Sequence, residues 1–101
     1  MATPKSAEFK AQPHVLKALA HPGRLLMLDG LSRGGRCVCE LAALAGSEML
    51  TVSRHLSQLK KAGIADDEKR GAQVFDRLAT PCVMNFCQCV ASVREKSRKQ
   101  E

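Results

Sequence analysis

The stretch from Ser47 to Gly63, SEMLTVSRHLSQLKKAG, constrains the fold of this chain more than any other segment. At about 100° per residue, Val52, Leu56 and Leu59 fall within about 60° of one another, so they form one apolar stripe of an amphipathic helix. Ser47 is expected to cap the start of this helix, and Gly63 to end it. The segment therefore predicts a helix that buries one face and exposes the other.

The opposite face of this helix carries polar and cationic side chains and one exposed leucine. These residues are Leu50, Ser53, Arg54, Ser57 and Lys61. Hydroxyl and guanidinium groups can bond to base edges in the major groove of DNA, an alkyl group can contact a thymine methyl, and an ammonium group binds phosphate. The alternative is an ordinary solvated surface helix, and the rest of the chain decides between the two.

The composition favours duplex DNA as the partner. The chain has 101 residues, a size that suits one domain and a permanent dimer, and its formal net charge of +6 favours a polyanion. It contains no Trp, no Tyr and only three Phe residues. It therefore lacks the aromatic platforms on which proteins that bind single strands stack bases.

The sequence predicts a cytoplasmic protein with reduced thiols. The start, MATPKSAEFK, has no apolar run and is no signal peptide, and the longest aliphatic run, 25–28, is far too short to span a membrane. The five cysteines are too few for a disulfide scaffold, so we expect core fillers, metal ligands or redox groups. An enzyme is not expected, because no nucleophile has a visible base and no phosphate-cradling loop occurs. No membrane partner and no small organic substrate are expected either.

The order of elements predicts a winged helix-turn-helix, mainly α-helical with a small β-hairpin wing. Helices are expected at 8–20 (in two pieces, because Pro13 breaks or restarts it), 22–31, 37–45, 47–63 and 81–93, and strands at 64–68 and 73–78. The second helix carries Leu25, Leu26, Leu28 and Leu31, and Gly30 and the pair Gly34–Gly35 are expected to close it. Two short helices joined by a tight turn at Gly46, the second with a polar outer face, are typical of a helix-turn-helix. We expect one domain over 1–101, with frayed ends at 1–7 and 95–101.

Two further segments extend this interpretation. Lys69 and Arg70 are expected at the hairpin tip, where they could lie over backbone phosphates. The last helix carries an apolar stripe of Cys82, Phe86, Cys89 and Val93. A stripe this apolar at the end of a small chain predicts a homodimer formed through the first and last helices.

Together these segments resemble the ArsR/SmtB family of winged-helix metalloregulators, from residue 15 to residue 93. ALAHPGRLLML resembles the opening helix pair of that family, TVSRHLSQLKKAGI its recognition helix and RCVCEL its best-known metal-binding sequence. The resemblance implies a homodimeric repressor that leaves its operator when it binds a metal or metalloid ion. It also implies base contacts from Met49, Leu50, Ser53 and Arg54.

The two cysteines of RCVCEL suggest how such a switch could work. On a regular helix, side chains two residues apart point about 200° away from each other, so Cys37 and Cys39 could not hold one ion there. In an extended or opened turn the two side chains could converge. We therefore expect ion binding to distort the start of the third helix and to disturb the recognition helix that it braces. The helix N-terminus, Arg33 and Arg36 are expected to favour the thiolate form of Cys37.

Arsenite or antimonite is the expected inducer, because such soft trivalent ions bind thiolates, ideally three. In the best-known arsenic-responsive members a third cysteine stands at the position of Ala42. The alternatives are two thiolates with a solvent ligand, a third thiolate from Cys82, Cys87 or Cys89, or another soft ion such as cadmium or lead. The cadmium and lead sensors of the family carry N-terminal cysteines that this chain lacks, and the zinc site that other members have on the last helix is not expected here.

Other interpretations stay open from the sequence. Cys82, Cys87 and Cys89 could serve as interface packing, as ligands or as a redox pair. The whole protein could be a thiol redox or reactive-sulfur sensor on the same fold. A different class is a small thiol protein that buffers metal ions and has no DNA role.

Overall fold

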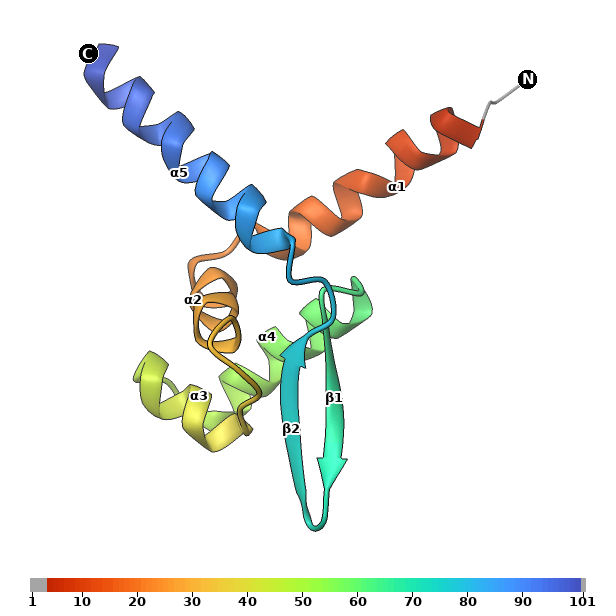
Figure 1. Cartoon of the computed structure of the whole chain (residues 1–101), viewed down its shortest axis with the longest axis vertical. Coiled ribbons are helices and arrows are strands. Elements are labelled where there is room, and N and C mark those ends of the chain that lie inside the picture. Colours follow the sequence, from red (N-terminus) through yellow and green to blue (C-terminus); the bar gives the residue numbers. More distant parts are fainter. Residues whose placement is uncertain (1–3, 101) are drawn as a thin grey trace.

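The computed structural model describes residues 4–100 and shows a winged helix-turn-helix (Figure 1). Its elements are α1 (Pro4–Leu19), α2 (Pro22–Leu31), α3 (Val38–Ala45), α4 (Met49–Lys61), β1 (Ala65–Arg70), β2 (Gln73–Leu78) and α5 (Val83–Gln100). The predicted fold class, mainly α-helical with a β-hairpin wing, is confirmed. None of the described helices is both long and apolar enough to cross a membrane.

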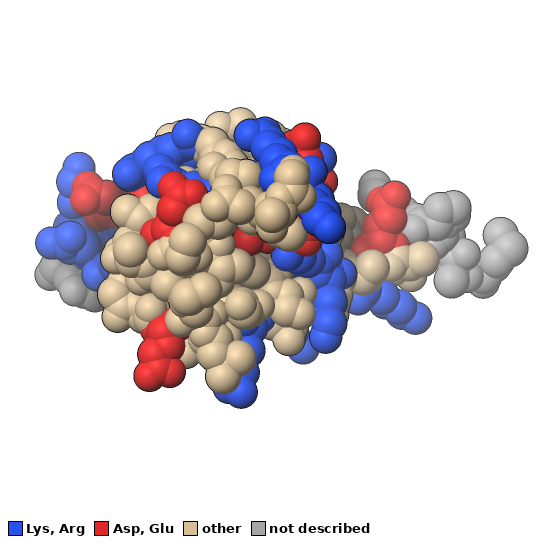
Figure 2. Space-filling view, turned by 90° about the horizontal axis from the view of Figure 1, so that it is seen from below, with Lys and Arg blue, Asp and Glu red and all other residues tan. Residues whose placement is uncertain are grey.

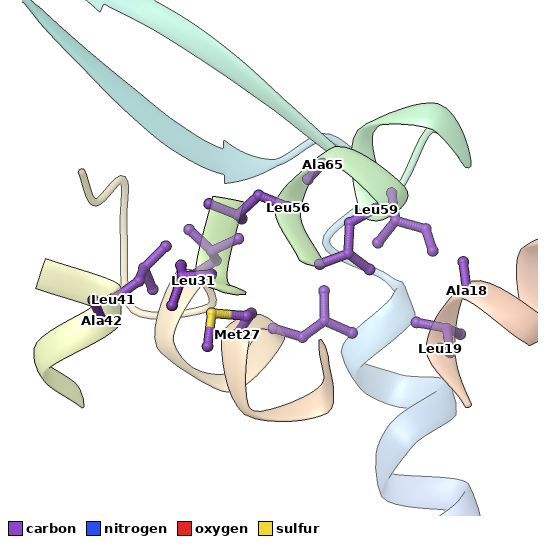
Figure 3. Close-up of a cluster of buried hydrophobic side chains, with 12 residues drawn as sticks. Ala18, Leu19, Met27, Leu31, Leu41, Ala42, Leu56, Leu59 and Ala65 are labelled. Carbon is purple, nitrogen blue, oxygen red and sulfur yellow. The ribbon is translucent and has the colours of Figure 1, made fainter. Parts of the chain in front are cut away.

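The core lies where α2, α3 and α4 meet, together with the end of α1 and the start of β1 (Figure 3). The predicted stripe of α4 is buried, with Val52 and Leu59 fully enclosed and Leu56 nearly so. Met27 and Leu28 of α2 fill the centre of this cluster. Burial of the apolar stripe therefore fixes which side of α4 remains exposed.

The turn before α4 differs from the prediction by one residue. Gly46 ends α3 in the left-handed conformation (φ 62°), and Ser47 N donates to Ala42 O, which closes the turn. The N-cap of α4 is Glu48 rather than Ser47, and no side chain caps it. At the other end, Gly63 follows the last turn with φ 83°, so its predicted role in ending the helix is confirmed.

The first two helices also differ from their predicted form. α1 runs unbroken through Pro13, which is exposed on a helix that projects away from the core (Figure 1), so the predicted break is wrong. Gly30 lies buried inside α2 rather than closing it. The side chains of Leu41 and Leu44 pack so close to Gly30 that a larger residue would have little space there. Leu25 and Leu26 are exposed, whereas Met27 takes the inward position.

The hairpin is longer than predicted. β1 starts at Ala65, after the buried Ile64, and continues through Arg70, which pairs with Gln73. A two-residue turn joins the strands, and Gly71 adopts the positive φ of 61° that such a turn requires. Arg36, just before α3, adds an isolated antiparallel bridge to Asp76 of β2.

Both terminal helices are long and diverge from the core (Figure 1). Residues 4–7 and 95–100 are helical, where the sequence predicts frayed ends; residues 1–3 and 101 lie outside the described part. Between α1, α2 and α5 lies an open apolar groove of 430 Å³, lined among others by Leu16, Leu25, Phe86 and Val90. These four side chains are exposed in the single chain.

Candidate nucleic-acid interface and thiol site

The outer face of α4 is open along its whole length. Leu50 is 61% exposed and Met49 54% exposed. Ser53, Arg54, Ser57 and Lys61 are exposed as well. Among the described residues, no carboxylate pairs with Arg54 or Lys61. The side chains predicted to face DNA are therefore exposed, and the two cations among them have no acidic partner in the described part of the chain.

The two predicted cations of the hairpin lie on opposite faces of it. Asp66, Glu68 and Arg70 alternate along one face of β1, where Glu68 pairs with Arg70 at 3.4 Å and with Arg77 at 3.0 Å. Arg70 also stacks over the Phe75 ring at 5.2 Å. Asp67 and Lys69 share the other face, and Asp67 of that face contacts α4 through Lys60. In the described part of the chain Lys69 has no acidic partner, so it is the freer of the two cations.

Figure 2 looks at the molecule from the end where the hairpin tip lies. Lys and Arg side chains flank a central surface that is largely uncharged, and a few acidic side chains stand among them. An uncharged strip between cationic borders matches a groove of bases between two phosphate backbones.

The structure corrects the predicted geometry of the cysteine pair. Cys37 is the N-cap of α3, with an extended backbone (φ −82°, ψ 162°), and it does not belong to the helix. Its Sγ lies 2.7 Å from Sγ of Cys39 in the first turn. The expected start of the helix at residue 37 is wrong: α3 starts at Val38, and the extended backbone of Cys37 lets the two sulfurs lie next to each other, as expected for an extended turn.

Glu40 holds Cys37 in this position. Cys37 N donates to Glu40 Oε1 at 3.2 Å, which is the Glu40 side of a capping box at the start of α3. Cys37 Sγ also donates to Glu40 Oε1, at 3.2 Å. Because of the hydrogen bond from the Cys37 amide, the pKa of Glu40 is lowered, so this carboxyl is ionised at neutral pH.

The pKa of Cys37 is raised, first by its contact with the Cys39 thiol. The expected thiolate is therefore not favoured at this position. Arg33 pairs with Asp29 at 2.9 Å, and Arg36 donates to Gly30 O at 2.9 Å. Both guanidinium groups therefore have partners other than the Cys37 sulfur. The site is a pair of thiols beside a carboxylate.

The remaining cysteines do not join this pair within one chain. Across residues 4–100, no three Cys, His, Asp or Glu side chains come together as a metal site. Cys82 and Cys89 are exposed on or near α5, and Cys87 is half-buried in the apolar groove. In the described part of the chain, none of these three cysteines joins Cys37 and Cys39 in a group of three potential ligands, and a third thiolate from one of them stays a prediction.

One buried ion pair was missed by the sequence reasoning. Asp76 of β2 is 0% exposed, and Lys60 Nζ lies 2.7 Å from its Oδ1 and 2.8 Å from Oδ2 of Asp67. Burial works to lower the pKa of Lys60, but the two carboxylates outweigh it and raise that pKa. The sequence carries no signal for this pair, since an Asp in a hairpin and a Lys in a last helical turn both look solvated.

Comparison with known proteins agrees with this arrangement. A family model described as "Bacterial regulatory protein, arsR family" matches residues 21–67, which run from the start of α2 into β1. The chain belongs to this arsR family. The matched segment contains both the cysteine pair and the exposed face of α4, so the family assignment covers the two sites described above.

Two curated relatives are transcriptional regulators. The "Biofilm growth-associated repressor" of Agrobacterium fabrum is 42% identical over 65 residues, which cover 64% of this chain and 56% of the relative. The "Arsenic resistance transcriptional regulator ArsR1" of Pseudomonas putida is 40% identical over 72 residues, which cover 70% and 56%. The chain thus spans little more than half the length of these relatives.

Two solved structures share the fold over nearly the whole chain. A homodimeric winged helix-turn-helix domain from Mycobacterium bovis, described as a possible ArsR-family regulator, has a TM-score of 0.84 and 29% identity over 100% of this chain and 94% of its own. The AntR antimony-specific transcriptional repressor has a TM-score of 0.73 and 29% identity over 98% and 88%. The relatives found are regulators of transcription and not enzymes.

Proposed function

We propose that this arsR-family protein is a homodimeric repressor that binds operator DNA and leaves it when a thiophilic metalloid, arsenite or antimonite, binds Cys37 and Cys39. One observation carries the proposal: two free thiols lie 2.7 Å apart at the start of the helix that packs against α4. An arsenic-resistance regulator and an antimony-specific repressor among the similar proteins support the choice of ion. The protein would act in the cytoplasm, where thiols stay reduced.

DNA binding is assigned to the exposed face of α4 and to the wing, β1–β2. Met49, Leu50, Ser53 and Arg54 would reach base edges from the first turns of α4. Ser57, Lys61, Lys69 and Arg70 would contact the phosphate backbone.

A second copy of the chain is proposed to fill the groove between α1, α2 and α5. The groove is apolar, and Phe86 and Val90 in its lining are exposed. The apolar surface extends further along α5 to Val93, which is also exposed. Exposed apolar area of this kind marks an interaction surface. The homodimeric domain that this chain resembles over its whole length supports a twin as the occupant.

The thiol pair suits a metalloid that carries hydroxide ligands, because these hydroxides can accept the thiol protons. When arsenous acid binds, each thiol proton leaves with one arsenic-bound hydroxide as water, and two As–S bonds form. One hydroxide remains as the third ligand, unless a thiolate of the partner subunit replaces it. No thiolate has to exist beforehand, which fits a cysteine whose pKa is raised.

Ion binding would act on Cys37 more than on Cys39. An ion held by both sulfurs would fix their separation and the directions of the two bonds. Cys39 is inside α3, whereas Cys37 is outside it, so the adjustment would fall on Cys37 and the residues before it.

The decisive experiment measures operator affinity with and without arsenite for the wild type, Cys37→Ser and Cys39→Ser. We expect arsenite to weaken binding by the wild type and to leave both variants bound. Cys89→Ser serves as the matched control, and a loss of response in it would assign the third ligand to α5. If neither arsenite nor antimonite changes the operator affinity of the wild type, the metalloid proposal is wrong.

The short sulfur separation also favours a second candidate, a thiol redox or reactive-sulfur sensor. The two thiols are neighbours, so an oxidant of the peroxide or polysulfide class could join Cys37 to Cys39 as a disulfide. Mass spectrometry after mild oxidation separates the two candidates. A defined, reversible bridge that releases the operator would support the sensor.

A further inference from the structure

Asp76 is a buried charge with a single cation beside it. Its side chain is fully enclosed, and neither of its carboxylate oxygens has a well-aligned hydrogen bond within the described part of the chain. The ammonium of Lys60, 2.7 Å from Oδ1, is therefore what compensates the charge. A buried carboxylate with one partner holds that partner closely, because separation would leave the charge uncompensated.

The same residue is held by its backbone to the segment that leads into the cysteine pair. Arg36 N donates to Asp76 O at 2.9 Å, and Asp76 N donates to Arg36 O at 2.7 Å. Arg36 immediately precedes Cys37. A displacement of Cys37 is therefore passed to β2 through two backbone hydrogen bonds, without any intervening side chain.

Lys60 extends the connection to both DNA-contacting elements. It stands in the last turn of α4 and also pairs with Asp67 of β1 at 2.8 Å. Asp67 and Asp76 face each other across the hairpin. One ammonium group of α4 thus contacts a carboxylate on each strand of the wing, and the side-by-side position of α4 and the hairpin base is visible in Figure 1.

We propose that Asp76 is a positioning residue that ties the Cys37 segment to α4 and to the wing at once, so that an ion between Cys37 and Cys39 changes how both meet DNA. The coupling to the ion rests on the proposed function, whereas the tie itself does not. Asp76 touches neither the thiols nor the exposed face of α4. It acts through Arg36 on one side and Lys60 on the other.

Three variants test the proposal. Lys60→Met removes the cation, and the matched control Asp67→Asn removes only its exposed partner and leaves the pair with Asp76 intact. The double variant Lys60→Met/Asp76→Asn removes both charges of the pair. It therefore distinguishes a loss of folding from a loss of the connection between Cys37, α4 and the wing. Its buried site is neutral and should fold even if Lys60→Met alone folds poorly.

The first measurement needs no ion: hydrogen exchange of the backbone amides of Arg36 and Asp76. We expect Lys60→Met to accelerate both by about tenfold or more, relative to the Leu28 amide in α2, because the bridge opens when water reaches the unpaired carboxylate. Asp67→Asn should stay within about threefold of the wild type. If the amides of Arg36 and Asp76 exchange at the same rate in Lys60→Met as in the wild type, the Lys60–Asp76 pair does not hold the bridge, and the proposed role of Asp76 is wrong.

The second measurement is the factor by which arsenite weakens operator binding. In the wild type we expect a factor within the usual range of allosteric coupling, about 5- to 150-fold. It should fall below about threefold in Lys60→Met and in the double variant, and should persist in Asp67→Asn. A full factor in the double variant would overturn the coupling, because a merely structural role changes stability and leaves this ratio alone.

The two proposals fail separately. If arsenite leaves operator binding by the wild type unchanged, the proposed function fails, and the exchange of the bridge amides alone decides the role of Asp76.

Discussion

Glu40 accepts two hydrogen bonds from Cys37, one from its backbone amide and one from its thiol, both at Oε1 and both at 3.2 Å. One carboxylate therefore caps α3 and orients the first sulfur of the thiol pair. The start of the helix and the geometry of the site have the same cause, which makes Glu40 a direct test of both.

Glu40→Gln should reduce the sensitivity of the folded chain to acid. The fold lowers the pKa of Glu40, first through the Cys37 amide, so the charged carboxylate stabilises the folded state above the ordinary pKa of glutamate. This contribution is lost as the pH falls through the lowered value, and Gln, which keeps an acceptor oxygen but has no charge, cannot lose it. Thermal unfolding at neutral pH and in acid measures the difference. Equal acid sensitivity of the variant and the wild type would contradict the assignment.

Leu50→Ala and Leu56→Ala should separate recognition from stability on the same helix. Leu56 is buried, so its truncation should cost about 2–5 kcal/mol of unfolding free energy. Leu50 is 61% exposed, and its truncation should leave stability nearly unchanged and relax the preference for thymine at one operator position. Chemical denaturation and binding to operators substituted at single positions measure the two effects. A large loss of stability in Leu50→Ala would show that this side chain is not free for DNA.

Lys61→Ala should weaken binding to all DNA sequences alike. Lys61 is exposed at the end of α4, and no carboxylate of the described chain neutralises it. Removing one phosphate contact should flatten the slope of log affinity against log salt by about 1. Titrations at several salt concentrations with specific and random duplexes measure this. A loss confined to one sequence would instead assign Lys61 to a base.

Lys69→Ala should reduce affinity and the salt slope more than Arg70→Ala. Lys69 lies on the hairpin face that turns toward α4 and has no described acidic partner, whereas Arg70 is held by Glu68 and the Phe75 ring. A guanidinium already paired has less to gain from a phosphate. The same salt titration ranks the two variants, and the reverse order would show that Arg70 leaves Glu68 when DNA binds.

Phe86→Asp should dissociate the proposed dimer. Phe86 lines the apolar groove between α1, α2 and α5, and a carboxylate there would be buried without a partner in the interface. We expect a folded monomer in light scattering and loss of operator binding, since one helix-turn-helix reads only a half-site. Ser92→Asp, on the same helix and outside the groove lining, is the control. A dimer that survives Phe86→Asp would place the interface elsewhere.

Local sequence patterns determined the elements of this protein and the exposed face of its recognition helix. The spacing of Val52, Leu56 and Leu59 has a period that only a helix can bury on one side, so the position of Arg54 and Lys61 follows without any long-range contact. The hairpin and its turn at Gly71 are local in the same sense.

Only the tertiary structure decided how the thiol pair and the buried carboxylate are placed. Cys37 lies outside α3 because Arg36 before it is extended against Asp76, a contact between segments far apart in the sequence. A shift of one residue in the start of the helix turned two sulfurs that seemed to diverge into neighbours. The burial of Asp76 likewise depends on how the hairpin docks on α4, and no local pattern encodes a contact of that kind.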